Sequence, residues 1–186
     1  EPYQGASTPI KDDYRQYGLG GSVVLEYSDV LRSLHPDGSY HLFLDNFFTS
    51  VPLLLELWKR KIKATATIRD NRTSNCPFVT TAEMKKRKRG SSDFQTAEDK
   101  VVLCKLNDNS VVTVASNAVP VSPLQSVSRF SRTEKKKIQI PQPRPVAIYN
   151  KHMGGVDRAD QNISLYRIAI RGKKWYFPII MQCIDM

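Results

Sequence analysis

Residues 42–44 are three consecutive apolar residues, and Asp45 follows them directly. An uninterrupted apolar run of this length is typical of a strand that is buried on both faces. Residues 51–61 carry apolar side chains at helical spacing, and the pair Thr49 and Ser50 just before them is suited to cap a helix. The pattern therefore predicts a strand, an acidic residue at its end and then a helix.

The segments on either side extend this pattern into an α/β core. Residues 62–68 are predicted to form a strand parallel to the first, which completes a βαβ unit with a right-handed crossover. In residues 22–34, apolar side chains recur every three or four positions, which predicts a helix capped by Ser22. Residues 35–38 (HPDG) predict a turn between that helix and the first strand.

The middle of the chain has a different character. Residues 101–106 and 111–115 are β-rich runs joined by the turn sequence NDNS, which predicts a hairpin. Residues 119–145 are rich in proline, serine and lysine, which predicts an extended connector. This connector leads to a second helix, predicted over residues 156–166.

Two acidic residues, Asp157 and Asp160, lie three positions apart on this helix and therefore share one face. A solvated first turn, favoured by the helix dipole, explains them without a ligand. A divalent cation is the other explanation, because Mg²⁺ takes one or two carboxylates and completes its shell with water and phosphate oxygens. Asp45 could join them if the helix packs beside the strand, since ligands collect beyond strand ends in α/β sheets. The alternative for Asp45 is that it caps its own turn.

Charge points to a polyanionic partner. The chain of 186 residues has a formal net charge of +10, which favours nucleic acid. Residues 85–89 (KKRKR) are five consecutive cations, and a solvated loop, contact with DNA phosphates and a nuclear import signal are all open. No segment approaches the roughly 18 apolar residues that a membrane-spanning helix needs.

Other chemistry is not indicated by the sequence. The three cysteines are widely spaced without a CxxC motif, which argues against a disulfide framework or a zinc site, and Walker, GxSxG and dinucleotide motifs are absent. Near the C-terminal end, four cations surround Trp175 and could hold a DNA backbone. The alternative is that Trp175 anchors a core.

Six blocks of the sequence together resemble one family. In chain order they are DNFFTSVPLLLELWKRK, ATATIRDNR, KRGSSDF, VVLCKLNDNSVVTVASN, YNKHMGGVDRADQ and KKW. They resemble the transposase domain of piggyBac elements and piggyBac-derived proteins over nearly the whole chain. The resemblance implies an α/β fold, namely an RNase H-like catalytic core with a β-rich insertion domain. Residues 1–70 would form the first part of the core, 71–141 the insertion with the basic loop, and 142–186 the returning acid-bearing helix and the start of the C-terminal region.

The resemblance also implies a catalytic site. It matches Asp45 to the second of the family's three catalytic aspartates, Asp157 to the third, and Asp160 to a further acid that supports the metal site. The family's first aspartate lies on a strand shortly before the segment that EPYQG resembles, so the core is expected to be incomplete here, without its first catalytic strand. A complete site would hold two Mg²⁺ ions, for which Mn²⁺ can substitute.

The expected function is metal-dependent cleavage and transfer of double-stranded DNA, at transposon ends and TTAA targets, by a nuclear homodimer. The alternative is a domesticated piggyBac-derived nuclear protein that binds DNA or a partner without transposase activity. Without the first aspartate, the chain alone is expected not to cleave DNA. The residues expected to bind DNA are Lys85, Lys86, Arg87, Lys88, Arg89, Arg167, Arg171, Lys173 and Lys174.

Overall fold

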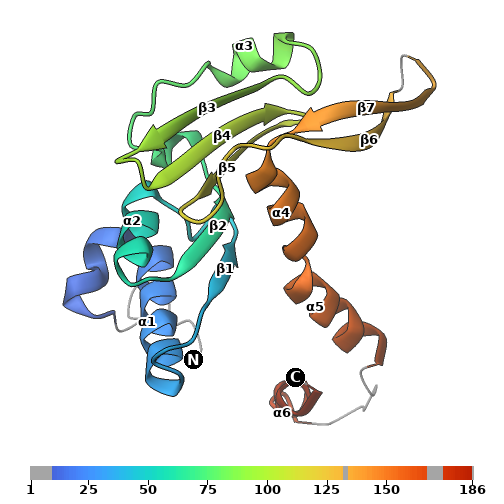
Figure 1. The fold of residues 1–186 in the computed structure, drawn as a ribbon. Coiled ribbons are helices and arrows are strands. Elements are labelled where there is room, and N and C mark those ends of the chain that lie inside the picture. Colours follow the sequence, from blue (N-terminus) through green and yellow to red (C-terminus); the bar gives the residue numbers. More distant parts are fainter. Residues whose placement is uncertain (1–9, 132–133, 167–173, 186) are drawn as a thin grey trace. The chain divides into compact units, whose positions relative to one another are not determined.

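The computed structural model describes residues 10–131, 134–166 and 174–185. The chain divides into two compact units, Glu1–Tyr149 and Asn150–Met186, and each is described by itself. The first unit holds a β-sheet with its covering helices, and the second is helical (Figure 1).

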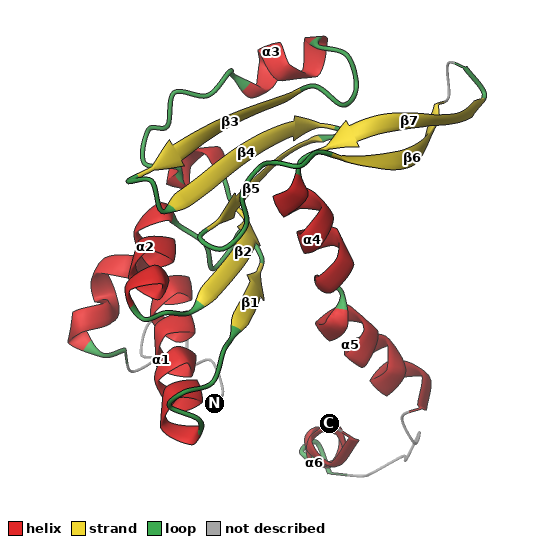
Figure 2. Cartoon of the chain, in the orientation of Figure 1, coloured by secondary structure: helices red, strands yellow, loops and turns green. Residues whose placement is uncertain are grey.

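Five strands of the described residues form one mixed sheet in the order β1-β2-β5-β4-β3 (Figure 2). β1 and β2 are parallel, and the other neighbours are antiparallel. Because β5 pairs with β2, the sheet continues beyond residue 70, and the division into a core and an insertion at residues 71–141 stays a prediction. The strands are β1 (His41–Leu44), β2 (Lys63–Thr67), β3 (Ser92–Ala97), β4 (Val101–Asn107) and β5 (Val111–Ser116).

The predicted βαβ unit is confirmed as β1, α2 (Val51–Lys59) and β2. The Ser50 hydroxyl caps α2 by accepting a hydrogen bond from the backbone N–H of Leu53 at 3.4 Å. The prediction that residues 42–44 are buried on both faces is wrong, because all of β1 is half-buried. Among the described residues β1 is the edge strand of the sheet, with β2 as its paired neighbour, which explains its incomplete cover.

Helix α1 (Gly18–Leu34) follows the short 3-10 helix η2 (Asp12–Tyr17) and starts earlier than predicted. Ser22 lies inside α1, where its hydroxyl donates to a backbone carbonyl one turn earlier at 2.8 Å, so the predicted Ser22 cap is wrong. Packing accounts for the difference. Gly20 is buried, and a Cβ atom there would lie 2.8 Å from the carbonyl oxygen of Phe47. Glycine thus lets α1 approach the backbone of the turn beyond β1.

Helices pack against both faces of the sheet. In β4, Leu103 belongs to the core shared with α1 and α2, whereas the next residue, Cys104, belongs to a smaller core with Val146. Val146 lies on α4 (Arg144–His152), a helix that the sequence pattern did not predict. The alternation is the expected result of a strand buried on both sides, and the predicted hairpin of β4 and β5 is confirmed.

After β2 the chain forms the 3-10 helix η3 (Asp70–Arg72) and the short helix α3 (Thr81–Lys86), which starts with a capping box. The basic run at residues 85–89 is therefore not a single solvated loop. Its first two residues end α3, and its last, Arg89, forms an ion pair with Asp108 at 2.7 Å.

The prediction of an extended connector over residues 119–145 is also wrong. β6 (Gln125–Ser131) and β7 (Lys136–Gln142) form an antiparallel hairpin that projects as an arm from the first unit (Figure 1). Ile138 and Ile140 alternate with polar residues in β7, and this strand pattern is obscured in the sequence by the neighbouring prolines.

The second unit contains α5 (Gly155–Tyr166) and α6 (Phe177–Asp185). α5 confirms the predicted acid-bearing helix. In the part of the chain that the structure describes, no helix combines the length and the apolar character needed to cross a bilayer.

Candidate functional site

Asp45 lies directly beyond β1, exposed at the start of a turn. Its backbone carbonyl accepts hydrogen bonds from the backbone N–H of Phe48 at 3.1 Å and from the hydroxyl of Thr49 at 2.9 Å. The backbone of Asp45, rather than its carboxylate, therefore closes the turn. The carboxylate remains available for other contacts at the strand end.

A chain of hydroxyl groups leads from this carboxylate to α4. The hydroxyl of Thr67, at the end of β2, donates to Oδ1 of Asp45 at 3.1 Å. The hydroxyl of Tyr149 lies 3.3 Å from Thr67 Oγ1. Because the single hydroxyl hydrogen of Thr67 is used in the hydrogen bond to Asp45, Tyr149 acts as the donor to Thr67. Parallel strands end at the same edge of a sheet, which is why Asp45 and Thr67 meet. The contacts place the first turns of α4 beside the acid.

Two arginines from the segment after β2 hold the turn in position. Arg69 Nε donates to the side-chain oxygen of Asn46 at 2.9 Å. Arg72 donates to the backbone carbonyls of Asn46, at 3.2 Å, and Phe47. The sequence analysis did not single out either arginine, although both fall in the block IRDNR. Their guanidinium groups add positive charge beside Asp45.

The Asp45 carboxylate can provide one ligand to a hard cation. The carboxylate is exposed and, among the described residues, its hydrogen bond comes from Thr67 through one oxygen, which leaves the other oxygen for a ligand. Within either unit, as far as the structure describes it, no three acidic, histidine or cysteine side chains come together to hold a metal. Asp45 alone therefore offers one ligand and needs partners from elsewhere.

Asp157 and Asp160 lie on α5 with exposed side chains. Their three-residue spacing on one helix puts both carboxylates on one face, as predicted. They belong to the second unit and Asp45 to the first, so the convergence of the three acids stays a prediction.

The predicted DNA-binding cations have different surroundings. Arg87 and Lys88 are exposed beyond α3, and Lys174 is exposed in the second unit. Trp175 is 81% exposed with its ring against Tyr176, so the prediction that it anchors a core is wrong. The predicted residues that lie outside the described part of the chain are Arg167, Arg171 and Lys173.

Arg89 is part of an ion-pair cluster that the sequence analysis missed. Asp108 accepts hydrogen bonds from Arg89 at 2.7 and 2.9 Å and from Arg129 at 2.9 Å. Partial burial would raise the pKa of Asp108, but the bonds from Arg129 and Arg89 outweigh it and hold the pKa below its usual value. We name these three residues the Asp108 cluster, which joins the β4-β5 turn to the β6-β7 hairpin.

A second missed pair pins the segment after β2 to the sheet. The ammonium group of Lys105, a residue of β4 that is only 2% exposed, lies 3.1 Å from a carboxylate oxygen of Asp70. Burial would raise the pKa of Asp70, yet hydrogen bonds from Thr81 and Lys105 keep it below the usual value. A single buried lysine in a strand gives no sequence signal that identifies its partner.

The three cysteines are free thiols. Burial raises the pKa of Cys104 to about 12, so its thiol stays protonated at neutral pH. Cys76 is partly buried and Cys183 exposed, and all three are free.

Comparisons with known proteins place the chain in a family. A family model described as Transposase IS4 matches residues 1–186. Human PiggyBac transposable element-derived protein 3 is 44% identical over 186 residues, which cover 100% of this chain and 31% of that protein. Human PiggyBac transposable element-derived protein 2 is 43% identical over 188 residues, with 100% of this chain and 31% of that protein covered.

The fold matches a solved relative. A piggyBac transposase determined in a synaptic complex with hairpin DNA superposes with a TM-score of 0.67 at 23% identity, over 100% of this chain and 36% of that chain. The chain spans about a third of the length of the human relatives. The resemblance to piggyBac proteins is thus confirmed, and the chain belongs to the Transposase IS4 family.

Proposed function

We propose that this chain forms part of the catalytic domain of a piggyBac-like DNA transposase, with Asp45, Asp157 and Asp160 as the metal-binding acids on an RNase H-like core. The observation that carries the proposal is the position of Asp45 at the end of a parallel strand, joined through Thr67 to Tyr149 on α4. The solved piggyBac relative, whose fold this chain shares, is a complex with DNA, which supports DNA as the substrate.

The chain connectivity supports the meeting of the acids. Asp157 follows Tyr149 by eight residues, a length that can span at most about 28 Å even when fully extended. Tyr149 is connected to Asp45 through a single threonine. The chain therefore leaves the first unit close to Asp45 just before it reaches the other two acids.

The roles of the side chains follow from their chemistry. The three carboxylates would hold Mg²⁺, or Mn²⁺ in its place, which activates the attacking oxygen and stabilises the leaving oxygen in phosphoryl transfer. Thr67 orients the Asp45 carboxylate by its hydrogen bond. Arg69 and Arg72 fix the turn and counter the negative charge of a nearby DNA phosphate.

Because the chain alone is expected not to cleave, the test uses a full-length protein that contains it. Nicking of duplex DNA that carries transposon ends is measured with Mg²⁺ or Mn²⁺ for that protein and for its Asp45→Asn and Asp157→Asn variants. We expect each variant to lose cleavage while it still binds DNA. Asp13→Asn is the matched control, because Asp13 is an exposed acid in no matching motif, and it should cleave as the unsubstituted protein does. Cleavage that survives Asp45→Asn would contradict the assignment.

A second candidate is a domesticated protein that keeps the fold and binds DNA or a partner without cleaving it. The observation in its favour is that the human relatives at 44% and 43% identity are named as transposable element-derived proteins. Binding of duplex DNA without nicking by the unsubstituted full-length protein would decide for it. Both candidates include our inferences of a nuclear location and a homodimer, which fluorescence microscopy and analytical ultracentrifugation would test.

A further inference from the structure

The hairpin of β6 and β7 has two different faces. Directly paired residues share a face, and the pair Val127 and Ile140 lies on the side that is buried or half-buried. The opposite side carries the pairs Phe130 with Lys137 and Ser128 with Gln139, all of them exposed. The hairpin thus presents a continuous polar face that bears one aromatic ring.

The hairpin is held at two places. Toward its turn end, the Asp108 cluster joins Arg129 to the β4-β5 turn, and Arg89 also donates to the backbone carbonyl of Phe130 at 3.0 Å. Gly90 lies beneath β7, where a Cβ atom would stand 2.9 Å from the ring of Pro141. The backbone of Gly90 has φ +90°, so glycine is needed both for this conformation and for the close approach. A hairpin fixed in this way can hold its exposed face in a defined direction.

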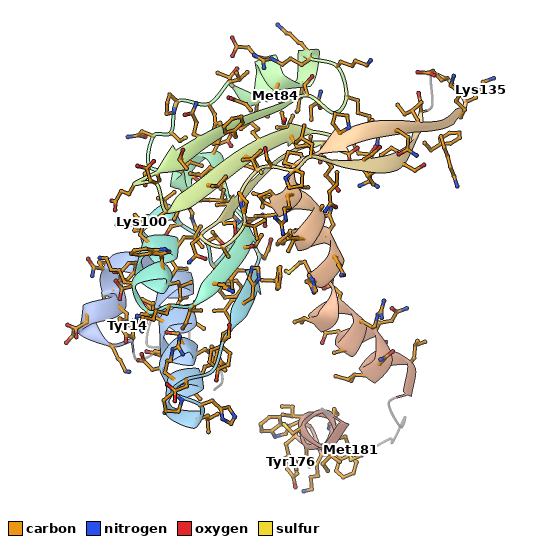
Figure 3. All side chains as sticks on the ribbon, in the orientation of Figure 1. Tyr14, Met84, Lys100, Lys135, Tyr176 and Met181 are labelled. Atoms are coloured by element: carbon orange, nitrogen blue, oxygen red, sulfur yellow. The ribbon has the colours of Figure 1, made fainter. Side chains whose placement is uncertain are left out.

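The far end of the hairpin is strongly basic. Lys135, Lys136 and Lys137 are consecutive and exposed, and Figure 3 shows Lys135 at the tip. Lys136 pairs with Glu134 at 3.0 Å, but this surface ion pair contributes little and exchanges readily. Phe130, which is 57% exposed, lies directly across from Lys137. Cations beside an exposed aromatic ring, with hydroxyl and amide groups along the same face, match the groups of a nucleic acid.

We propose that the β6-β7 hairpin is a DNA-binding arm, which contacts phosphates through Lys135, Lys136 and Lys137 and the groove through the face that carries Phe130. The inference rests on the proposed function, because it takes DNA as the substrate. The DNA-binding surface that it assigns contains neither the three acids nor the basic run at residues 85–89. The major groove of B-DNA admits a two-stranded β-ribbon. Seven-residue strands are about 23 Å long, which corresponds to about seven base pairs.

The experiment measures binding of the protein to a duplex DNA oligonucleotide by fluorescence anisotropy, over a series of salt concentrations. The test variant is Lys135→Gln/Lys136→Gln/Lys137→Gln. Each lost phosphate contact reduces the slope of log K against log salt by about 0.9, so the slope should fall by about 2.7. The matched control neutralises three exposed lysines between the end of α2 and the first residue of β2, namely Lys59, Lys61 and Lys63, and should keep the slope.

A second variant, Phe130→Ala, should lower the affinity severalfold without changing the slope, because it removes no charge. As a control for folding, circular dichroism and amide hydrogen exchange of β6 and β7 are measured for both variants, which should keep the hairpin. An unchanged slope in the triple variant, or an equal loss in the control, would overturn the inference. Failure of the unsubstituted protein to bind duplex DNA would instead overturn the proposed function.

Discussion

The two hairpins of the first unit are built on different principles. β4 and β5 are buried strands, and Leu103, Cys104 and Val114 are at most 1% exposed in two cores. β6 and β7 are largely exposed, and the Asp108 cluster joins Arg129 of β6 to the β4-β5 turn. The first hairpin depends on apolar burial and the second on a few directed polar bonds. The comparison indicates that the second can be released or altered while the first stays folded.

The largest effect is expected in the buried hairpin. Leu103→Ala removes a side chain from the main core and leaves a cavity, which should lower the free energy of unfolding by about 2–5 kcal/mol. Urea denaturation monitored by circular dichroism measures the change. A loss below about 1 kcal/mol would show that the two hairpins do not differ as described.

A smaller and local effect is expected from Asp108→Asn. The substitution removes the charge that Arg89 and Arg129 share, at a cost of about 1–3 kcal/mol for the hydrogen bonds to charged groups. Amide hydrogen exchange should become faster in β6 and β7 and stay unchanged in the centre of β4 and β5. Equal acceleration in both hairpins would contradict the separate anchoring of the second.

Acid should loosen the same hairpin. The pKa of Asp108 is lower in the folded protein than its usual value, so its contribution to stability is complete above about pH 4 and is lost as the pH falls through the folded pKa. Hydrogen exchange of β6 and β7, corrected for the intrinsic pH dependence, should show reduced protection below about pH 4. Asp108→Asn should remove this pH dependence, and its persistence in that variant would assign it to other groups.

The smallest effect on stability is expected for Phe130→Ala. The ring is exposed on the hairpin, so its removal should change the free energy of unfolding by no more than about 0.5 kcal/mol. The same urea experiment measures it beside Leu103→Ala. A loss of 2 kcal/mol or more would mean that Phe130 packs against the protein, which would remove it from the proposed DNA-binding face.

The sequence predicted the buried part of the fold well. The βαβ unit and the β4-β5 hairpin were found because burial imposes a regular apolar period on strands and helices. α5 was found from its apolar spacing, although nearly all of its described side chains are exposed. The start of α1 was placed too late, since the buried Gly20 is a packing requirement that resembles a loop signal in the sequence. β6 and β7 were missed because the prolines in and after β7 obscure its alternation of apolar and polar residues.

In the candidate site, too, the sequence predicted some residues and missed others. Asp45 was correctly placed at a strand end, because the apolar run before it marks the strand. Thr67, Tyr149 and the two arginines around the turn were not found, since a hydroxyl or guanidinium group carries no period that indicates which residue it will meet. Only the paired strands and α4 bring these groups together.

The close contact between Gly20 and the turn beyond β1 has a consequence for judging whether such a chain is still active. A larger residue at position 20 would push against the carbonyl of Phe47, two residues beyond Asp45. The acid would keep its identity and lose its position, so an inventory of surviving aspartates would overlook the damage. A substitution at the start of α1 can therefore remove the proposed cleavage activity with every carboxylate still present.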